Sequence, residues 1–121
     1  MREWIIVGSI FAVIGVLMGA FGSHGLKTRV TSEDLIIFET GVRYQMYHAI
    51  GLIILGVIGI NFPYGMIQIP GYLFSLGILL FSGSLYLLVI TNIRWFGAVT
   101  PIGGLCFIAG WILLSLNIYK S

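Results

Sequence analysis

The stretch FETGVRYQMYHA, residues 38–49, carries polar and charged side chains directly into an apolar run that continues to Ile60. At 100° per residue on a helix, these polar side chains follow one another around about half of the circumference. Polar and ionisable groups at the mouth of a membrane are costly unless they are paired or face a cavity. The stretch therefore predicts a membrane helix that carries a candidate site near its beginning.

The composition indicates a chain that sits in lipid. Of its 121 residues, 59% are hydrophobic and only 8% are charged, whereas a soluble domain carries about 25% charged residues. The 17 glycines lie within apolar runs, as is common in membrane helices. The net charge of +2 is small and dispersed, so we expect no nucleic-acid partner. The single cysteine excludes a disulfide within the chain.

Four apolar segments are long enough to cross a bilayer, which takes about 20 residues. We expect a single domain, residues 1–121, with spans at about 4–22, 42–60, 70–91 and 101–119. The sequence therefore predicts an all-α membrane protein, a four-transmembrane-helix bundle that runs up-down-up-down.

Local signals refine the beginnings of these helices. Thr31-Ser32-Glu33-Asp34 is typical of a helix start, with a capping hydroxyl and acidic residues in the first turn. We expect a short amphipathic helix there, at the interface before the second span, with Gly41 as a bend. Pro70 fits the first turn of the third span, and Thr100-Pro101 fits the start of the fourth.

Small residues recur at helical spacing in the first and fourth spans. Such seams let two helices approach closely in a membrane, and a spacing of four and three suits a left-handed crossing. The predicted packing residues are Gly8, Ala12, Gly15, Gly19 and Gly22 in the first span and Gly103, Cys106 and Gly110 in the fourth.

The distribution of basic residues predicts the orientation in a cell membrane. Arg2 and Lys120 lie on the side of the termini, while Lys27, Arg29, Arg43 and Arg94 lie on the side of the first and third loops. Positive-inside counting places these loops in the cytoplasm and both termini outside. Aromatic residues expected in an interfacial belt are Trp4, Tyr64, Tyr72 and Tyr119 outside and Trp95 inside.

The candidate site is a polar cluster at the cytoplasmic-side boundary. The end of the first span and the start of the second are neighbours in an up-down bundle, and the third loop arrives at the same end. The members are His24, Glu39, Arg43, Tyr44, Gln45, Tyr47, His48 and Arg94. A purely structural reading is equally open, because Glu39 and Arg43 can pair four residues apart and both histidines can bond to backbone.

Three functions are compatible with this cluster. It can form the mouth of a path for a small solute or an ion, for which a bundle this small would need a homo-oligomer. It can bind a lipid headgroup or a partner protein, since basic residues at the cytoplasmic interface attract anionic lipid. Two histidines are too few to favour a metal or haem, so we expect no cofactor and no metal. No nucleophile–base pair, phosphate loop or carboxylate pair is present, which argues against an enzyme.

Four motifs in order carry a resemblance that covers nearly the whole chain. They are GAFGSHGL (residues 19–26), VRYQMYHA (42–49), LFSGSLY (80–86) and TPIGG (100–104). Together they resemble the YgdD/YwdK family of small bacterial inner-membrane proteins, a family of unknown function with distant eukaryotic relatives. The resemblance implies a multi-span protein of the bacterial cytoplasmic membrane. It implies no established activity, so it supplies no catalytic residues. Ser23 stands where the family often has alanine.

The sequence thus favours a small permeation or transport component that works as a homo-oligomer. The alternative is a non-catalytic accessory protein that binds membrane lipids or a partner. The two functions differ in what Arg43 and His48 should face. A transport path needs both residues on a water-filled vestibule, whereas an accessory protein lets them face headgroups or a partner surface.

Overall fold

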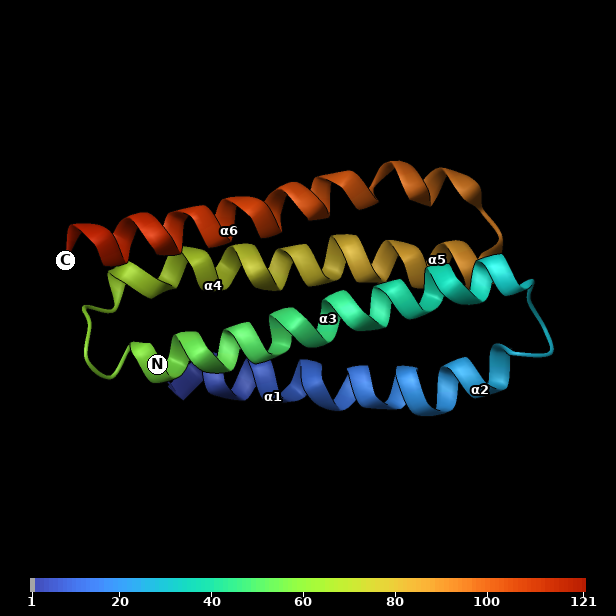
Figure 1. The fold of residues 1–121 in the computed structure, drawn as a ribbon, viewed down its shortest axis with the longest axis horizontal. Coiled ribbons are helices and arrows are strands. Elements are labelled where there is room, and N and C mark those ends of the chain that lie inside the picture. Colours follow the sequence, from blue (N-terminus) through green and yellow to red (C-terminus); the bar gives the residue numbers. More distant parts are fainter. Residues whose placement is uncertain (1) are drawn as a thin grey trace.

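The computed structural model describes residues 2–121 and contains four long helices that run antiparallel in chain order (Figure 1). Each is long and apolar enough to cross a membrane, so the all-helical, four-span architecture is confirmed. The four spans are Arg2–Leu26, Ser32–Ile58, Gly65–Thr91 and Arg94–Lys120, called the first to the fourth helix below. Both termini lie at one end of the molecule, together with the loop between the second and third helices.

Three of the four long helices change geometry along their length. The first consists of α1 (Arg2–Val16), the π-helical segment η1 (Leu17–Gly22) and α2 (Ser23–Leu26). The second is α3 alone (Ser32–Ile58). The third consists of α4 (Gly65–Gly77), the π-helical segment η2 (Ile78–Ser82) and α5 (Gly83–Thr91). The fourth begins with the 3₁₀ turn η3 (Arg94–Ala98) and continues as α6 (Thr100–Lys120).

The helices lie in a row, in which each packs against the one before it in the chain (Figure 1). Within residues 2–121 the first and fourth helices share no extended contact. The second and third helices accordingly bury far more of their length than the two outer ones. A row leaves grooves between helices that are not direct neighbours, and these grooves face lipid.

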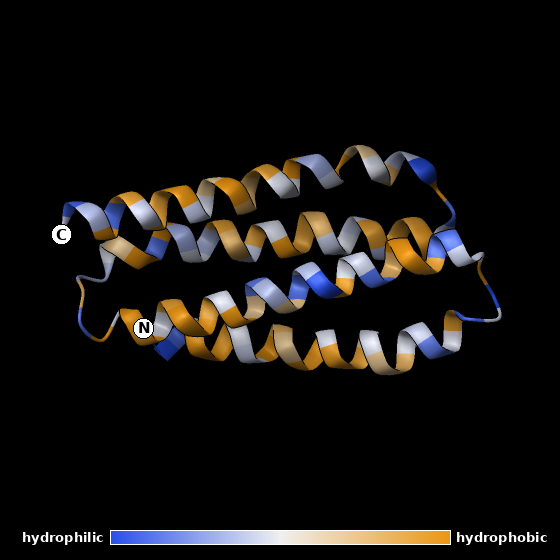
Figure 2. Cartoon of the chain, viewed as in Figure 1, coloured by the Kyte–Doolittle hydropathy of each residue, from blue (hydrophilic) through white to orange (hydrophobic). Residues whose placement is uncertain are grey.

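Helix lengths place the ends of the molecule in the headgroup region. A helix of 27 residues, such as the second, is about 40 Å long, which exceeds the hydrocarbon thickness of about 30 Å. Hydrophilic residues gather at the helix ends and in the loops, as expected, but Figure 2 also shows a hydrophilic stretch partway along α3. This stretch belongs to the polar segment with which the second helix enters the membrane.

The beginning of the second helix differs from the sequence expectation. The segment expected to form a separate interfacial helix is continuous with the span, because α3 runs from Ser32 to Ile58 without a break. Thr31 caps it by accepting a hydrogen bond from the Asp34 backbone N–H at 3.1 Å. Gly41 does not bend the helix; it allows Tyr86 of α5 to approach so closely that an added Cβ would lie 2.9 Å from the ring. The glycine therefore serves packing.

The third helix begins earlier than Pro70 suggests. It starts at Gly65, so that Pro70 lies inside α4. A proline there cannot donate to the carbonyl four residues before it, which is that of Met66. The side chain of Asn117 in α6 donates to this Met66 carbonyl at 2.8 Å. The interior proline is tolerated because the fourth helix supplies the missing donor.

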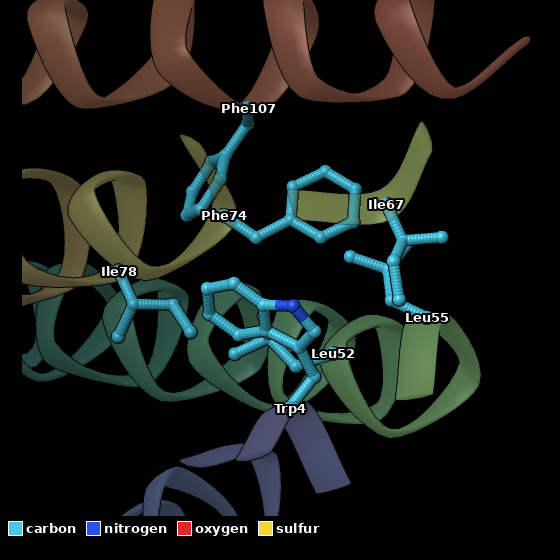
Figure 3. Packing of buried hydrophobic residues seen from close by; sticks show 7 residues of the cluster. All are labelled: Trp4, Leu52, Leu55, Ile67, Phe74, Ile78 and Phe107. Atoms are coloured by element: carbon cyan, nitrogen blue, oxygen red, sulfur yellow. The ribbon is translucent and has the colours of Figure 1, made fainter. Parts of the chain in front are cut away.

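An aromatic and aliphatic cluster holds the helices together near the end with the termini (Figure 3). It comprises Trp4, Leu52, Leu55, Ile67, Phe74, Ile78 and Phe107, and it extends from that end to the middle of the third and fourth helices. Trp4 is only 5% exposed and meets Tyr72 edge-on with ring centroids 5.1 Å apart. Trp4 is thus a core residue of the bundle, unlike the interfacial belt residue that its position in the sequence suggests.

Small residues set the distance between adjacent helices. An added Cβ would lie 2.6 Å from the Ala49 carbonyl oxygen at Gly8 and 3.0 Å from Val42 at Gly19. Gly15 and Gly22 meet Met46 and Phe38 in the same way, so the four predicted packing glycines of the first helix face α3. Gly103 and Gly110 of α6 pack against Phe81 and Phe74 of the third helix. Ala12 and Cys106 are partly buried.

Candidate functional site

The polar residues that the sequence suggests as one cluster lie in several different places on α3 and on the neighbouring helices. Gln45 and His48 are buried, Glu39 is partly buried, and Arg43, Tyr44 and Tyr47 are exposed. Arg94 lies at the end of the molecule that carries the first and third loops, and His24 lies exposed in α2. The side chains therefore serve different surroundings and do not form one site.

His48 is enclosed by aromatic side chains. Its ring stacks on Phe107 with centroids 3.5 Å apart, and Phe74 and Trp111 contact its other sides. Its Nδ1 lies 2.8 Å from the Tyr44 carbonyl oxygen, and its Nε2 accepts a hydrogen bond of 3.0 Å from the Trp111 indole. Since a carbonyl can only accept and an indole N–H can only donate, Nδ1 carries the proton. Both ring nitrogens are thus occupied by the fold.

Gln45 links three helices. Its side-chain amide donates to the Phe11 carbonyl of α1 at 2.8 Å, and its oxygen accepts from the Tyr86 hydroxyl of α5 at 2.6 Å. One turn away, the Ser82 hydroxyl donates to the Gly41 carbonyl at 2.6 Å. These buried polar contacts lie beside the π-helical segments η1 and η2, and such segments are frequent at functional sites.

Glu39, Arg43 and Tyr47 line a groove on the opposite flank of the contact between the first two helices. Gly19 and Ser23 form its other wall, and its volume is about 330 Å³. We call it the Glu39–Arg43 groove. Within residues 2–121 neither charged group makes an ion pair, and the Ser23 hydroxyl is buried without a hydrogen-bond partner. This groove therefore holds charged and polar groups whose bonding capacity is not used inside the chain.

Arg94 forms a bidentate ion pair that the sequence did not predict. Its guanidinium donates to both carboxylate oxygens of Asp34, at 3.0 and 2.8 Å. The pair connects the start of the fourth helix to the start of the second. In the sequence Asp34 is visible only as an acid in the first turn of a helix, and no local signal indicates a partner sixty residues away.

A cavity of about 480 Å³ opens beside this pair, between the first and third loops. Arg29, Thr31, Asp34, Asn92 and Arg94 supply its polar lining. Asp34 uses one edge of Arg94, while Arg29 has no ion pair within the described part of the chain. The cavity thus carries more positive than negative charge and is suited to an anion.

An apolar groove leads from this cavity down between the first and third helices. A space of about 450 Å³ adjoins the cavity at Leu26, Arg29 and Ile90, and a further 170 Å³ adjoins that space at Met18. Phe38 and Gln45 of α3 line its floor. We call these three neighbouring spaces, which share lining residues, the first–third groove. It exists because the first and third helices both pack on α3 and, beyond the contact of Trp4 with Gly71 and Tyr72 near the termini, share no extended contact.

Two glycines line the first–third groove at positions where a side chain would meet nothing. An added Cβ at Gly25 or at Gly83 has no neighbouring atom within 4 Å. At its inner end the groove reaches the hydrogen-bonded pair of Gln45 and Tyr86. The groove is therefore charged at its mouth and apolar along the rest of its length.

No site for a metal is visible in residues 2–121, where histidine, cysteine and carboxylate side chains form no group of three or more. His24 lies outside both grooves, and His48 uses both of its ring nitrogens within the fold.

Four spanning helices with small-residue contacts and lipid-facing grooves define an integral membrane protein. The family described as "Protein of unknown function (DUF423)" matches residues 18–104. The chain belongs to this family, as the resemblance of its four motifs predicted.

Full-length relatives support the assignment. The chain is 46% identical to a UPF0382 membrane protein of Staphylococcus haemolyticus, over 99% of this chain and 98% of the relative. It is 44% identical to the UPF0382 membrane protein YwdK of Bacillus subtilis, over the same shares of the two chains. No solved structure matches the chain. These relatives are uncharacterised membrane proteins, so the comparisons leave the molecular function to the geometry.

Proposed function

We propose that this protein is a non-catalytic membrane protein that binds an anionic phospholipid in the first–third groove. The observation that carries the proposal is the continuity between an arginine-lined cavity and an apolar groove. A phospholipid has the same sequence of properties, with a charged phosphate followed by an acyl chain.

The mouth of the groove lies at the level where lipid phosphates lie. Arg29 and Arg94 are at the ends of helices that are longer than the hydrocarbon core is thick. Guanidinium groups bind phosphate oxygens through paired N–H donors, and basic residues near a membrane surface favour anionic lipids by about 1 kcal/mol each. Asp34 fixes the orientation of Arg94, so that Arg29 and the outer edge of Arg94 remain for the phosphate.

The interior of the groove suits one acyl chain. Met18, Phe21 and Ile90 supply apolar walls, and open space lies above Gly25 and Gly83. An acyl chain that lies along a protein surface keeps the apolar contacts that it has in the bilayer, so occupancy depends on the headgroup contacts and on shape.

Permeation is the other function that the sequence suggests, and it has less support. A path would need Arg43 and His48 on one vestibule. Arg43 faces the outside of α3, whereas His48 is stacked on Phe107 and bonded to Trp111. Transport through this chain would therefore require a path formed between copies.

The orientation belongs to the same proposal. We place the protein in the cytoplasmic membrane with the mouth of the first–third groove on the cytoplasmic side, where Lys27, Arg29 and Arg94 follow the positive-inside pattern. Both termini then lie outside. Labelling of single cysteines in the loops of intact cells tests this orientation independently of lipid binding.

Native mass spectrometry of the purified protein with phosphatidylglycerol tests the proposal. Two variants address the two ends of the groove. Arg29→Gln should lower the affinity for the lipid about fivefold, since it removes about 1 kcal/mol of attraction. Gly83→Leu fills open space in the inner groove and should displace the acyl chain without a clash.

Two matched controls exclude general effects. Lys27→Gln removes a charge from the same loop but not from the cavity lining, and Gly65→Leu adds the same side chain at a glycine that is equally open but lies outside the groove. Equal lipid retention in all four variants and the unaltered chain would overturn the proposal, as would equal retention of phosphatidylcholine and phosphatidylglycerol.

A further inference from the structure

The outer face of α3 carries a second unexplained feature, which lies away from the first–third groove. Exposed residues recur along it at spacings of seven, four, three, four and three. This pattern keeps one stripe on one face of a helix and is the pattern by which two membrane helices pack in a left-handed pair. The stripe comprises Ile36, Arg43, Tyr47, Ile50, Ile54 and Val57.

Charge on this face needs a partner. Arg43 lies near the middle of the 27 residues of α3, with Glu39 one turn closer to the helix beginning. Charged groups at this depth are costly in hydrocarbon unless they are paired. Within residues 2–121 neither group makes an ion pair, although they are four residues apart on one helix. The fold thus presents one acid and one base, both unneutralised, toward lipid.

We propose that this face binds the same face of a second copy of the chain, with Arg43 of each protomer reaching Glu39 of the other. The charges are self-complementary, which a symmetric dimer requires, because the same patch meets itself. Both copies insert in the same direction, so the two α3 helices run parallel. Side chains on a helix tilt toward its beginning, which carries Arg43 toward the level of the partner's Glu39.

The Glu39–Arg43 groove provides room for this exchange. Its volume of about 330 Å³ is open beside Glu39, and the buried Ser23 hydroxyl in its wall has no partner within the described chain. An incoming guanidinium has five N–H donors and can bond to both oxygens of the Glu39 carboxylate. Below the charges the stripe is apolar, so Ile50, Ile54 and Val57 supply the packing surface.

The proposal can be tested with charge-reversal variants of the full chain in reconstituted liposomes. Association is measured as energy transfer between two copies that carry different labels. Glu39→Arg alone and Arg43→Glu alone each place like charges across the interface. Each should weaken association at least about threefold, the lower end of what interhelical polar contacts contribute. An equimolar mixture of the two variants restores opposite charges between copies and should recover association. Pairing within one chain cannot produce this recovery, because each variant carries two like charges.

Cysteine cross-linking provides a readout that does not depend on the charges. In a Cys106→Ser background, Ile50→Cys should cross-link to a second copy, whereas Ile112→Cys should not, although both positions are about half exposed. Equal cross-linking at both positions, or association unchanged by either charge reversal, would overturn the proposal. A loss of bound phospholipid in Glu39→Arg with unchanged association would also overturn it and would assign the face to a headgroup.

Discussion

His48 shows at the residue scale how a polar group is accommodated between membrane helices. One ring nitrogen donates to the Tyr44 carbonyl, the other accepts from Trp111, and one ring face stacks on Phe107. The residue thereby joins the second helix to the fourth. A histidine with both nitrogens occupied in this way is not free to bind a metal or a solute, so its role is to fix the position of α6.

Replacement of the Trp111 donor measures the strength of this link. Trp111→Phe keeps an aromatic ring and leaves Nε2 of His48 without a partner, which should lower the free energy of unfolding by about 1–3 kcal/mol. Denaturant titration in detergent provides the measurement. Trp95→Phe is the matched control, because Trp95 is 65% exposed and should tolerate the change. Equal effects of the two substitutions would show that the hydrogen bond to His48 contributes little.

Asn117 and Pro70 form a second link between helices, this time between the fourth and the third. Asn117→Leu leaves the Met66 carbonyl without a donor and should destabilise the protein by about 1–3 kcal/mol. Pro70→Ala restores a backbone N–H that can bond to the same carbonyl. In the Pro70→Ala background the Asn117→Leu substitution should therefore cost much less. A double-mutant cycle in the same titration measures the difference, and strict additivity would contradict the compensation.

Sequence reasoning succeeds with signals that act over a few residues. Thr31 caps α3 and Pro101 lies in the first turn of α6, as the local patterns predicted, whereas Thr100 does not cap α6 and bonds to Ser84 of the third helix. The ion pair between Asp34 and Arg94 and the hydrogen bond from Asn117 to the Met66 carbonyl could not be predicted, because they join residues more than fifty positions apart. Whether the predicted polar cluster acts in function stays a prediction.

At the scale of elements, contacts between helices depend on where glycine replaces a side chain. The sequence suggests a first turn at Pro70 and a bend at Gly41, yet both residues lie inside helices, since packing outweighs intrinsic propensity. The four spans were predictable because each is long and apolar. The full lengths of the helices could not be predicted, because the helices continue beyond the apolar segments into polar residues at their ends.

Two adjacent glycines of α6 test the packing seam directly. An added Cβ at Gly103 would lie 2.8 Å from the Phe81 Cα, whereas at Gly104 the nearest atom is 3.8 Å away. Gly103→Ala should therefore destabilise the protein by about 1–3 kcal/mol, as overpacking does. Gly104→Ala should be neutral or stabilising by up to about 1 kcal/mol, because it only reduces the backbone freedom of the unfolded chain. Thermal unfolding in one detergent compares them, and the reverse order would contradict the seam.

At the scale of the whole molecule, the row of helices explains why the protein has lipid-facing grooves. A closed bundle would hide the space between the first and third helices, whereas here that space remains open above α3. The sequence could not predict the groove, because four apolar spans with small residues are equally compatible with a closed bundle. The groove with its arginine-lined mouth carries our proposal of lipid binding, and the outer face of α3 carries our proposal of self-association.

The most direct test of lipid binding is a crystal structure from a lipidic phase that contains phosphatidylglycerol with brominated acyl chains. The account predicts a phosphate within hydrogen-bonding distance of Arg29 and Arg94, with bromine signal between the first and third helices toward Gln45 and Tyr86. A groove that is closed by contact between these helices, or bromine signal spread evenly around the protein, would contradict it.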